Sequence, residues 1–241
     1  MIVRMGLFRK RADLNTEQFA EHWRERHGPL VKRSVRALDG YIQNLVVDRT
    51  QKGIEYQRAG LEVDAISQLF FRSLSSMRRS VSGSVLDELK ADEERFMEGL
   101  VIVTAVQNTV VAPPKTGKFV KRMSLIRKRQ EMSSEEFQHQ WFDVHSVLVK
   151  RLPGLLGYRQ NLTIDWQVDR FSDESADVPF GVDGIVELWF EDGPAIERAF
   201  QSPAGLTAMS HAREFLGEVS TYVVAPVHIV QEGELSRPQA A

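Results

Sequence analysis

The chain contains an internal duplication. Three aromatic and imidazole side chains at a spacing of four residues, Phe19, Trp23 and His27, return as Phe137, Trp141 and His145. Between residues 5–33 and 123–151, a constant offset of 118 gives thirteen identities in twenty-nine positions. A repeat of this length predicts two copies of one folding unit, and it constrains the fold more than any other feature of the sequence.

Each copy has the same predicted order of elements. A helix is expected after a capping pair, Asn15 with Gln18 in the first copy and Ser133 with Glu136 in the second. Gly28 and Pro29 predict a break or kink in the first copy's helix alone. The remaining patterns predict strands at 2–8, 40–48, 63–71 and 100–111 and a second helix at 86–97, with second-copy counterparts at 157–165, 182–190, 205–216 and 219–230.

This β-α-β-β-α-β order is that of a ferredoxin-like unit, so the fold class is α+β. Two helices cover one face of such a sheet and leave the other face bare, and the second copy is the natural cover. We therefore expect two ferredoxin-like repeats packed sheet to sheet as an intramolecular α/β barrel, with the pocket between the sheets. The expected boundaries are a first domain at 1–112, a linker at 113–118, a second domain at 119–231 and a tail at 232–241.

Composition excludes several classes of function. The 241 residues carry a net charge of −2, which gives no electrostatic case for nucleic acid or an anionic membrane as partner. The absence of cysteine excludes disulfides and thiolate chemistry, and it suits a cytoplasmic location. The N-terminus lacks a signal-peptide pattern, and no apolar run approaches the roughly 20 residues of a membrane span. We expect a small-molecule substrate, no metal and no cofactor, and both a monomer and a homodimer are compatible with the sequence.

Strand alternation predicts which side chains line the pocket. In the third strand of each copy, one parity set mixes apolar and polar groups as a ligand cavity does, and comprises Asp64, Ile66, Gln68 and Phe70 with Asp183, Ile185, Glu187 and Trp189. In the second strand of each copy, we expect one set of side chains to face the barrel interior. This set comprises Tyr41, Gln43, Leu45 and Val47 with Tyr158, Gln160, Leu162 and Ile164.

The two copies differ at one informative position, where Gln68 of the first becomes Glu187 of the second. A carboxylate inside an apolar barrel has its pKa raised by desolvation, which suits a general base near neutral pH. The second copy is therefore the better candidate for catalysis.

At the Phe19, Trp23 and His27 motif, at residues 40–44 and at residues 182–190, the chain resembles the EthD family of dimeric α/β barrel proteins. The resemblance covers both repeats and implies a barrel formed by pairing, with a pocket between sheets and helices. Relatives of this fold include isomerases, polyketide cyclases and cofactor-free monooxygenases, and some barrels of the superfamily bind haem. The acids or bases that the resemblance implies are His27, His145, Tyr41, Tyr158, Asp64 and Asp183. Leu45 and Leu162 stand where relatives often carry a further histidine.

Each candidate also has a purely structural interpretation. The positive charge of a buried histidine is stabilised near a helix C-terminus by the helix dipole. An aspartate at a strand end is a common turn residue. With both interpretations open, the catalytic candidates are His145, Asp183, Glu187, Tyr158, His27, Tyr41 and Asp64, and the substrate-binding candidates are Gln43, Gln68, Phe70, Gln160 and Trp189.

Three functions are compatible with these patterns. The first is a cofactor-independent lyase, isomerase or cyclase that moves a proton on a small, largely apolar substrate of aromatic, lactone or polyketide type. The second is a non-catalytic binding or accessory protein of a catabolic oxygenase. The third is a haem-dependent or cofactor-free oxygenase.

Overall fold

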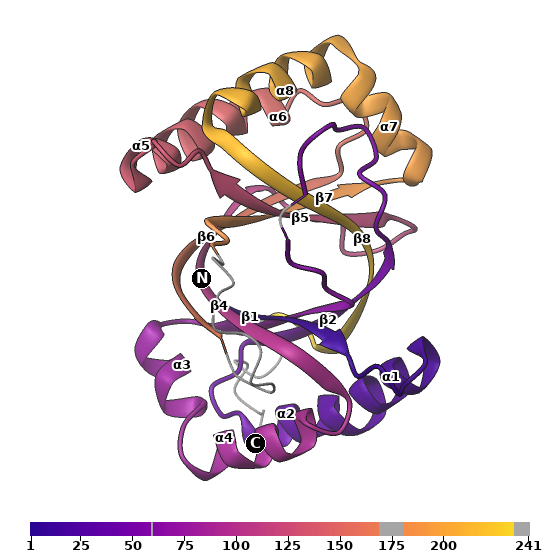
Figure 1. Ribbon diagram of the computed structural model, residues 1–241, viewed down its shortest axis with the longest axis vertical. Coiled ribbons are helices and arrows are strands. Elements are labelled where there is room, and N and C mark those ends of the chain that lie inside the picture. Colours follow the sequence, from indigo (N-terminus) through magenta and orange to yellow (C-terminus); the bar gives the residue numbers. More distant parts are fainter. Residues whose placement is uncertain (59, 169–180, 234–241) are drawn as a thin grey trace, which may run out of the picture.

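The computed structural model describes residues 1–58, 60–168 and 181–233 (Figure 1). The helices of the two copies lie at opposite ends of the molecule, and the strands form a barrel between them. Part of the expected tail lies outside the described residues, as do residues 169–180 between two of the predicted strands.

The first half, residues 1–111, supplies four strands, one helix of three segments and a pair of short helices. Its strands are β1 (Ile2–Lys10), β2 (Gly40–Asp48), β3 (Ala65–Phe71) and β4 (Met97–Val111). One helix runs through α1 (Thr16–His22), the π-helix η1 (Trp23–His27) and α2 (Gly28–Ser34). The other pair is α3 (Leu74–Ser80) and α4 (Ser84–Glu93).

The second half repeats this order. Its strands are β5 (Val120–Lys128), β6 (Gly157–Val168), β7 (Gly184–Phe190) and β8 (Leu216–Val230). Its first helix runs through α5 (Ser134–His139), the π-helix η2 (Gln140–His145) and α6 (Ser146–Val149), and its second pair is α7 (Gly193–Gln201) and α8 (Pro203–Phe215). The sequence patterns did not predict α3 and α7, which are short helices of 7 and 9 residues placed just after a buried strand.

All eight strands close into one antiparallel barrel in the order β1-β3-β2-β8-β5-β7-β6-β4. Each half keeps the ferredoxin-like order, β4-β1-β3-β2 and β8-β5-β7-β6. The halves join at two seams, where β2 pairs with β8 and β4 pairs with β6. The predicted intramolecular barrel is confirmed, and closure leaves none of these strands as a free sheet edge.

The barrel interior is packed rather than hollow. Val3, Met5, Leu7, Ile66 and Phe70 of the first half form one buried cluster with Met123, Leu125, Ile185, Tyr222 and Val224 of the second. Separate clusters fill the space between the sheet and the helices of each half. The expected pocket between the sheets is therefore occupied by side chains, and the two hollows described below lie between sheet and helices.

The loop after β2 joins the halves outside the barrel. It runs up the side of the second half, beside β8 and toward α7 (Figure 1). There the Gln51 side chain accepts a hydrogen bond from the Thr221 backbone N–H at 3.2 Å, and Ile54 packs into the second half's core. The first half thus supplies part of the wall around the second half's interior.

The expected break at Gly28 and Pro29 is wrong. The helix continues through both residues, and Pro29 follows directly after the π-helical segment as the second residue of α2. Both copies instead widen to a π-helix at the same place, η1 and η2, although the second copy has Ser146 and Val147 there. The cause is therefore shared by the copies and is not the proline.

Candidate functional site

The π-helices explain the repeated Gly-Tyr-x-Gln-Asn segment. The Gln43 side-chain amide donates to the Trp23 carbonyl oxygen at 2.7 Å and to the Tyr41 hydroxyl at 3.1 Å. Gln160 does the same to the Trp141 carbonyl and the Tyr158 hydroxyl, at 2.7 and 2.9 Å. A π-turn shifts the pattern of backbone hydrogen bonds in the helix. In both copies a glutamine from the sheet donates an additional hydrogen bond to a backbone carbonyl of that turn.

The same contacts correct the predicted orientation of the second strands. Tyr41, Gln43, Tyr158 and Gln160 face the helices, so the prediction that they face the barrel interior is wrong. The opposite set, which includes Ile42 and Val46, lies inside. The third strands are oriented as predicted, with Ile66, Gln68 and Phe70 and their counterparts Ile185, Glu187 and Trp189 directed inward.

A fully buried polar cluster crosses the barrel between the two halves. Lys121 Nζ lies 2.6 Å from Glu187 Oε2 and donates to Gln68 Oε1 at 2.8 Å and to Asn44 Oδ1 at 2.9 Å. Gln68 and Asn161 both donate to Glu187 Oε1, at 2.9 and 2.8 Å. The carboxylate is paired with an ammonium and accepts from two side-chain amides, which is the arrangement that buried charges require.

The raised pKa that the sequence predicted for Glu187 is wrong. Desolvation alone raises the pKa of its carboxyl, but the attraction of Lys121 and Arg159 outweighs burial and holds the pKa below its ordinary value. The carboxylate stays ionised at neutral pH and is 0% exposed, so no substrate reaches it in this conformation. Its position supports a structural role at the junction of the halves.

A second charged group, Arg159, lies near this cluster. The Arg159 guanidinium makes a bidentate pair with Glu232, at 2.8 and 2.9 Å. Its Cζ lies 6.0 Å from the centre of the Phe70 ring and 5.9 Å from that of Trp189. Phe70 and Trp189, predicted to bind substrate, thus pack beside an arginine of the chain itself. Glu232, placed by the sequence in an unpacked tail, is an ordered partner of the barrel.

Asp64 and Asp183 bind the ends of neighbouring strands, β1 and β5. The Asp64 carboxylate accepts from the Lys10 backbone N–H at 2.9 Å and pairs with Arg49, and Asp183 accepts from the Lys128 backbone N–H at 2.9 Å. Neither lines the hollows described here. These contacts favour the structural interpretation of both aspartates.

The two motif histidines have different partners. His27 Nδ1 lies 2.9 Å from Asp92 Oδ2 and is buried between η1 and α4, away from both hollows. His145 Nδ1 lies 3.2 Å from Nδ1 of His211, which stands where the first half has Asp92, 119 residues earlier. Burial, with a smaller contribution from His211, lowers the pKa of His145 to about 3, so its imidazole is neutral near pH 7.

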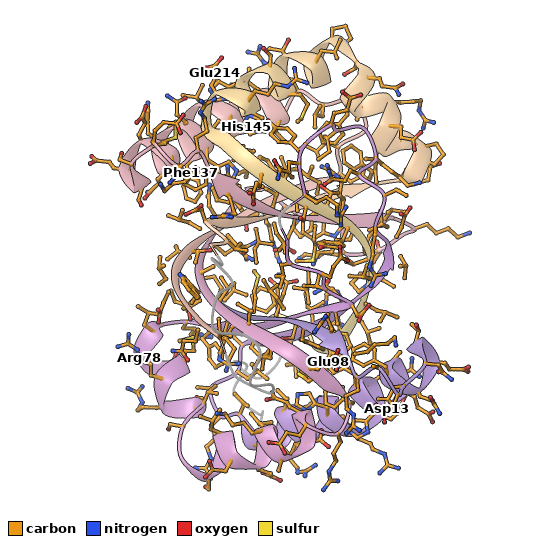
Figure 2. The ribbon with its side chains drawn as sticks, in the orientation of Figure 1. Asp13, Arg78, Glu98, Phe137, His145 and Glu214 are labelled. Carbon is orange, nitrogen blue, oxygen red and sulfur yellow. The ribbon has the colours of Figure 1, made fainter. Side chains whose placement is uncertain are left out.

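His145 and Tyr158 line one hollow in the second half, between the sheet and helices η2, α6 and α8. Figure 2 places His145 beneath the helices at that end of the molecule. The hollow has a volume of about 50 Å³, and most of its wall is apolar, with Trp141, Phe200 and Met209 among the lining residues. Ile54 of the first half completes the wall.

Arg122 brings an unbalanced charge to this hollow. Its side chain is 3% exposed and lies over the Phe200 ring, with Cζ 4.5 Å from the ring centre. One Nη donates to the Thr221 hydroxyl at 3.1 Å, while Nε has no hydrogen-bond partner. No carboxylate of the described residues pairs with it, and burial lowers its pKa to about 9, which keeps it charged at neutral pH. A buried cation without a counter-ion favours an anion in the adjacent space.

The profile of the EthD domain family matches residues 11–99 and 129–218 of the chain, one domain in each half. The chain belongs to the EthD family. The two matched domains cover both copies of the Phe-Trp-His motif and of the glutamine that binds the π-helix. No curated protein matches this EthD chain.

Solved structures with the same fold span nearly the whole EthD tandem. A candidate monooxygenase from Fusobacterium nucleatum superposes with a TM-score of 0.60 at 8% identity, covering 96% of this chain and 95% of its own. An anthrone oxidase-like protein gives a TM-score of 0.57 at 12% identity, with 100% and 96% covered. A candidate monooxygenase from Lactobacillus acidophilus gives 0.53 at 11% identity, with 95% and 96% covered. At these identities the likeness establishes the fold alone.

Arg122 and Lys121 were not among the residues that the sequence pointed to. Arg122 repeats Arg4 at the same offset of 118 and directly precedes the identical stretch, so extending the comparison by one position would have marked it. Lys121 has Val3 as its counterpart and gives no such signal, since only the closed barrel brings it to Glu187.

Metal and haem sites find little support in the part of the EthD tandem that the structure describes. Those residues contain no group of three or more His, Asp or Glu side chains placed to hold a metal ion. A haem with His145 as axial ligand does not fit, because the hollow of about 50 Å³ beside that residue is far smaller than the macrocycle. Across the same described ranges, no helix is long and apolar enough to cross a membrane.

Proposed function

We propose that this EthD protein is an enzyme that removes a proton from a small, largely apolar carbon acid bound in the second-half hollow. The observation that carries the proposal is Arg122, a buried cation with no counter-ion among the described residues, which faces an apolar space together with a neutral histidine and a tyrosine. An anion formed in that space meets a fixed positive charge in a surrounding of low dielectric, where such charges stabilise most.

The hydrogen-bond chain behind His145 supports its role as the base. Gln140 Oε1 only accepts, so His211 Nε2, 3.0 Å away, carries a hydrogen. With Nδ1 of His211 as the acceptor, the hydrogen between the two Nδ1 atoms belongs to His145. This leaves Nε2 of His145 with a free electron pair. The base is a neutral imidazole held in one tautomer by two side chains behind it, and the anion that forms beside it raises its low pKa as it takes the proton.

Tyr158 supports the role of a hydrogen-bond donor to the developing anion. Its hydroxyl oxygen already accepts from Gln160, which leaves the hydroxyl hydrogen for another partner. Burial raises its pKa well above the ordinary value, so it stays protonated. Arg122 and Tyr158 together suit an oxyanion such as an enolate, with His145 taking the proton from carbon.

The size of the hollow limits the substrate. About 50 Å³ is room for a few water molecules, and a larger substrate requires Phe200, Met209 or the loop that carries Ile54 to move aside. Loss of a proton is a first step common to isomerases, cyclases and oxygenases that activate the substrate itself. What happens to the anion after the proton is lost defines the reaction class. Of the proteins with this fold, two carry the name monooxygenase and one the name anthrone oxidase-like.

The test uses nitroethane, a small carbon acid whose anion has two oxygens, with exchange of its methylene hydrogens for deuterium followed by NMR. We expect saturable exchange by the wild-type protein and a loss of about 100-fold in Arg122→Met and in His145→Gln. Tyr158→Phe should lose at least about tenfold. Arg36→Met, at an exposed arginine, is the matched control and should not change the rate.

Three outcomes contradict the proposal. In the first, the wild-type protein exchanges neither nitroethane nor the larger acetylacetone. In the second, both Arg122→Met and His145→Gln exchange at the wild-type rate. In the third, the protein binds the compound saturably without exchange, which would make it a carrier. An oxygen electrode in the same mixture shows whether the anion goes on to react with O2.

A further inference from the structure

Arg159 binds a carboxylate of its own chain in the geometry by which arginines recognise carboxylate ligands. Its two Nη atoms donate to the two carboxylate oxygens of Glu232 at 2.8 and 2.9 Å. The Arg159 side chain is 8% exposed, and its Nε is buried without a hydrogen-bond partner. The equivalent residue of the first half, at an offset of 117, is the apolar Ile42, so one half alone carries this carboxylate-binding group.

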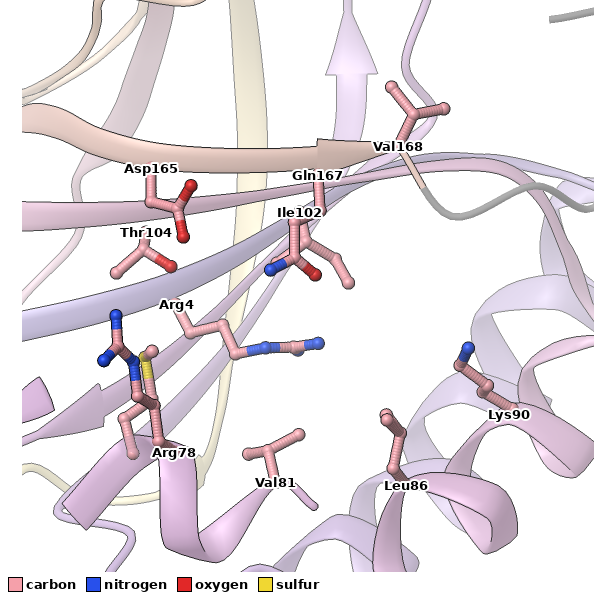
Figure 3. Close-up of a pocket in the computed structure, with 11 residues that line it drawn as sticks. Arg4, Arg78, Val81, Leu86, Lys90, Ile102, Thr104, Asp165, Gln167 and Val168 are labelled. Carbon is pink, nitrogen blue, oxygen red and sulfur yellow. The ribbon is translucent and has the colours of Figure 1, made fainter. Parts of the chain in front are cut away.

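This pair lies apart from the two hollows. Figure 3 shows the first-half hollow, which has a volume of about 240 Å³ and lies between β1, β4, β6 and the helices α3 and α4, and Arg159 lines neither it nor the second-half hollow. Arg159 is the third residue of β6, and the two rings beside its guanidinium, Phe70 and Trp189, stand next to last in β3 and β7. The arginine therefore lies where strands begin or end, and Glu232 approaches it there from beyond the end of β8.

The charges around Arg159 depend on Glu232. In the described part of the chain, two carboxylates attract the guanidinium, those of Glu187 and Glu232. Glu187 is also paired with Lys121, with Oε2 and Nζ 2.6 Å apart. If Glu232 departed, the guanidinium would keep only a carboxylate that Lys121 already neutralises, so an anion from solution would be favoured in the vacated place.

Glu232 is attached less firmly than the arginine that it binds. It follows the last residue of β8 by two positions, and its side chain is 32% exposed. Beside it, the Gly233 backbone N–H donates to the Asp39 carbonyl oxygen at 2.7 Å. Segments of this kind open at a lower free energy than strands inside a sheet, so residues 231–233 can leave while the barrel stays closed.

The internal repeat supplies a comparison for this segment. At the offset of 119, Glu232 corresponds to Pro113 of the linker. A Cβ on Gly40 would lie 3.2 Å from Cα of Glu232. On Gly157, the counterpart of Gly40, it would lie 2.7 Å from Cα of Pro113, so the two segments cross the strands at matching places. Pro113 is fixed between β4 and β5, whereas Glu232 has a strand on one side only within the described ranges.

We propose that Arg159 is the centre of a second ligand site, which takes a small monocarboxylate with an apolar group when residues 231–233 leave. The carboxylate of the ligand replaces that of Glu232 on the guanidinium, and the rings of Phe70 and Trp189 suit its apolar part. A tethered carboxylate has an effective concentration of about millimolar, so Glu232 sets the concentration of free ligand that opens the site. The site does not depend on proton transfer beside Arg122.

Calorimetric titration with phenylacetate tests this inference, with the neutral phenylacetamide as comparison ligand. We expect Glu232→Ala to bind phenylacetate at least about tenfold more tightly than the wild-type protein does, because the competing carboxylate is gone. Phenylacetamide should bind to neither protein. Phenylacetate should also raise the melting temperature of Glu232→Ala more than that of the wild type, and this measurement holds even if the variant is less stable.

Two further variants and one exchange measurement locate the bound ligand. Glu218→Ala is the matched control, because it removes the carboxylate of another arginine pair, with Arg127 at 3.0 Å, whose two members both lie on strands. It should bind phenylacetate no more tightly than the wild type does. Arg159→Met, added to Glu232→Ala, should abolish binding. In the wild type, excess phenylacetate should speed hydrogen exchange of the Gly233 N–H, because the departing segment loses its bond to Asp39.

The inference is overturned if Glu232→Ala binds phenylacetate no more tightly than the wild type or Glu218→Ala, or if phenylacetamide binds as well as phenylacetate. It is also overturned if the double variant keeps the affinity of Glu232→Ala, or if the Gly233 N–H exchanges at the same rate with and without excess phenylacetate.

Discussion

Lys121 and Glu187 form an ion pair at the centre of the barrel, with Nζ and Oε2 2.6 Å apart and the two side chains 1% and 0% exposed. Their counterparts in the first half are Val3 and Gln68, both uncharged. The second half therefore carries a matched pair of buried charges that the first half lacks, and Gln68 reaches across to share Glu187 with Lys121.

Breaking this pair from one side should strongly destabilise the protein. Glu187→Gln leaves a buried ammonium without its counter-ion, and Lys121→Val leaves a buried carboxylate, so each should lower the free energy of unfolding by about 3–5 kcal/mol. The double variant recreates the uncharged arrangement of Val3 and Gln68 and should recover most of that loss. Urea unfolding of the four proteins measures the coupling, and additive losses in the double variant would show that the pair is not a unit.

His145 should make stability depend on pH. An unfolded histidine binds a proton near pH 6.5, while burial lowers the pKa of folded His145 to about 3. Between these values the unfolded state binds more protons, so stability decreases as pH falls from about 6.5 toward 3, with a slope of up to ~1.4 kcal/mol per pH unit. His145→Gln should flatten this dependence, and the exposed His139→Gln should not. Parallel curves for wild type and His145→Gln would refute the assignment.

Arg122 and Arg159 provide a contrast between an unpaired and a paired buried arginine. Arg122→Met removes a buried charge that has no counter-ion among the described residues, so it should raise the free energy of unfolding by about 1–3 kcal/mol while it slows proton transfer about 100-fold. Arg159→Met removes one side of a bidentate pair with Glu232 and should lower stability by about 2 kcal/mol. Thermal unfolding at low ionic strength compares them, and a destabilised Arg122→Met would contradict the functional interpretation of that charge.

Gly184 is required where Trp141 packs onto the sheet. A Cβ at this position would lie 2.3 Å from Cζ3 and 2.4 Å from Cη2 of the Trp141 ring. Gly184→Ala should therefore displace the ring and cost about 1–3 kcal/mol of stability. Gly60→Ala, whose Cβ meets nothing within 4 Å, should change stability by less than about 0.5 kcal/mol. Equal effects of the two substitutions would argue against this packing.

Much of the fold follows from the repeat, because each copy alone has an uncovered sheet and the second copy is tethered beside it. The orientation of the third strands was also predictable, since their two faces differ in composition. The second strands have polar and apolar residues on both faces, and what decides their orientation is the Trp23 and Trp141 carbonyls, which accept from Gln43 and Gln160. A π-turn gives no clear signal in sequence, so that orientation was predicted wrongly.

The site was less accessible to sequence reasoning than the fold. His145 and Tyr158 were identified from their motifs, and the structure places both at one hollow. Glu187 was assigned a raised pKa because only its desolvation could be anticipated, whereas Lys121 approaches it from a strand 66 residues away in the chain. Whether a buried charge is balanced depends on such distant partners, and the same reason concealed the unpaired state of Arg122.

The central claim is that the second half uses Arg122 to stabilise an anion formed by proton loss. Its most direct test is the rate of hydrogen exchange of nitroethane with the Arg122→Met protein, measured beside the wild type and Arg36→Met at one pH. The account predicts that Arg122→Met stays folded and loses about 100-fold in rate while Arg36→Met keeps the wild-type rate. Exchange by folded Arg122→Met at the wild-type rate would contradict it.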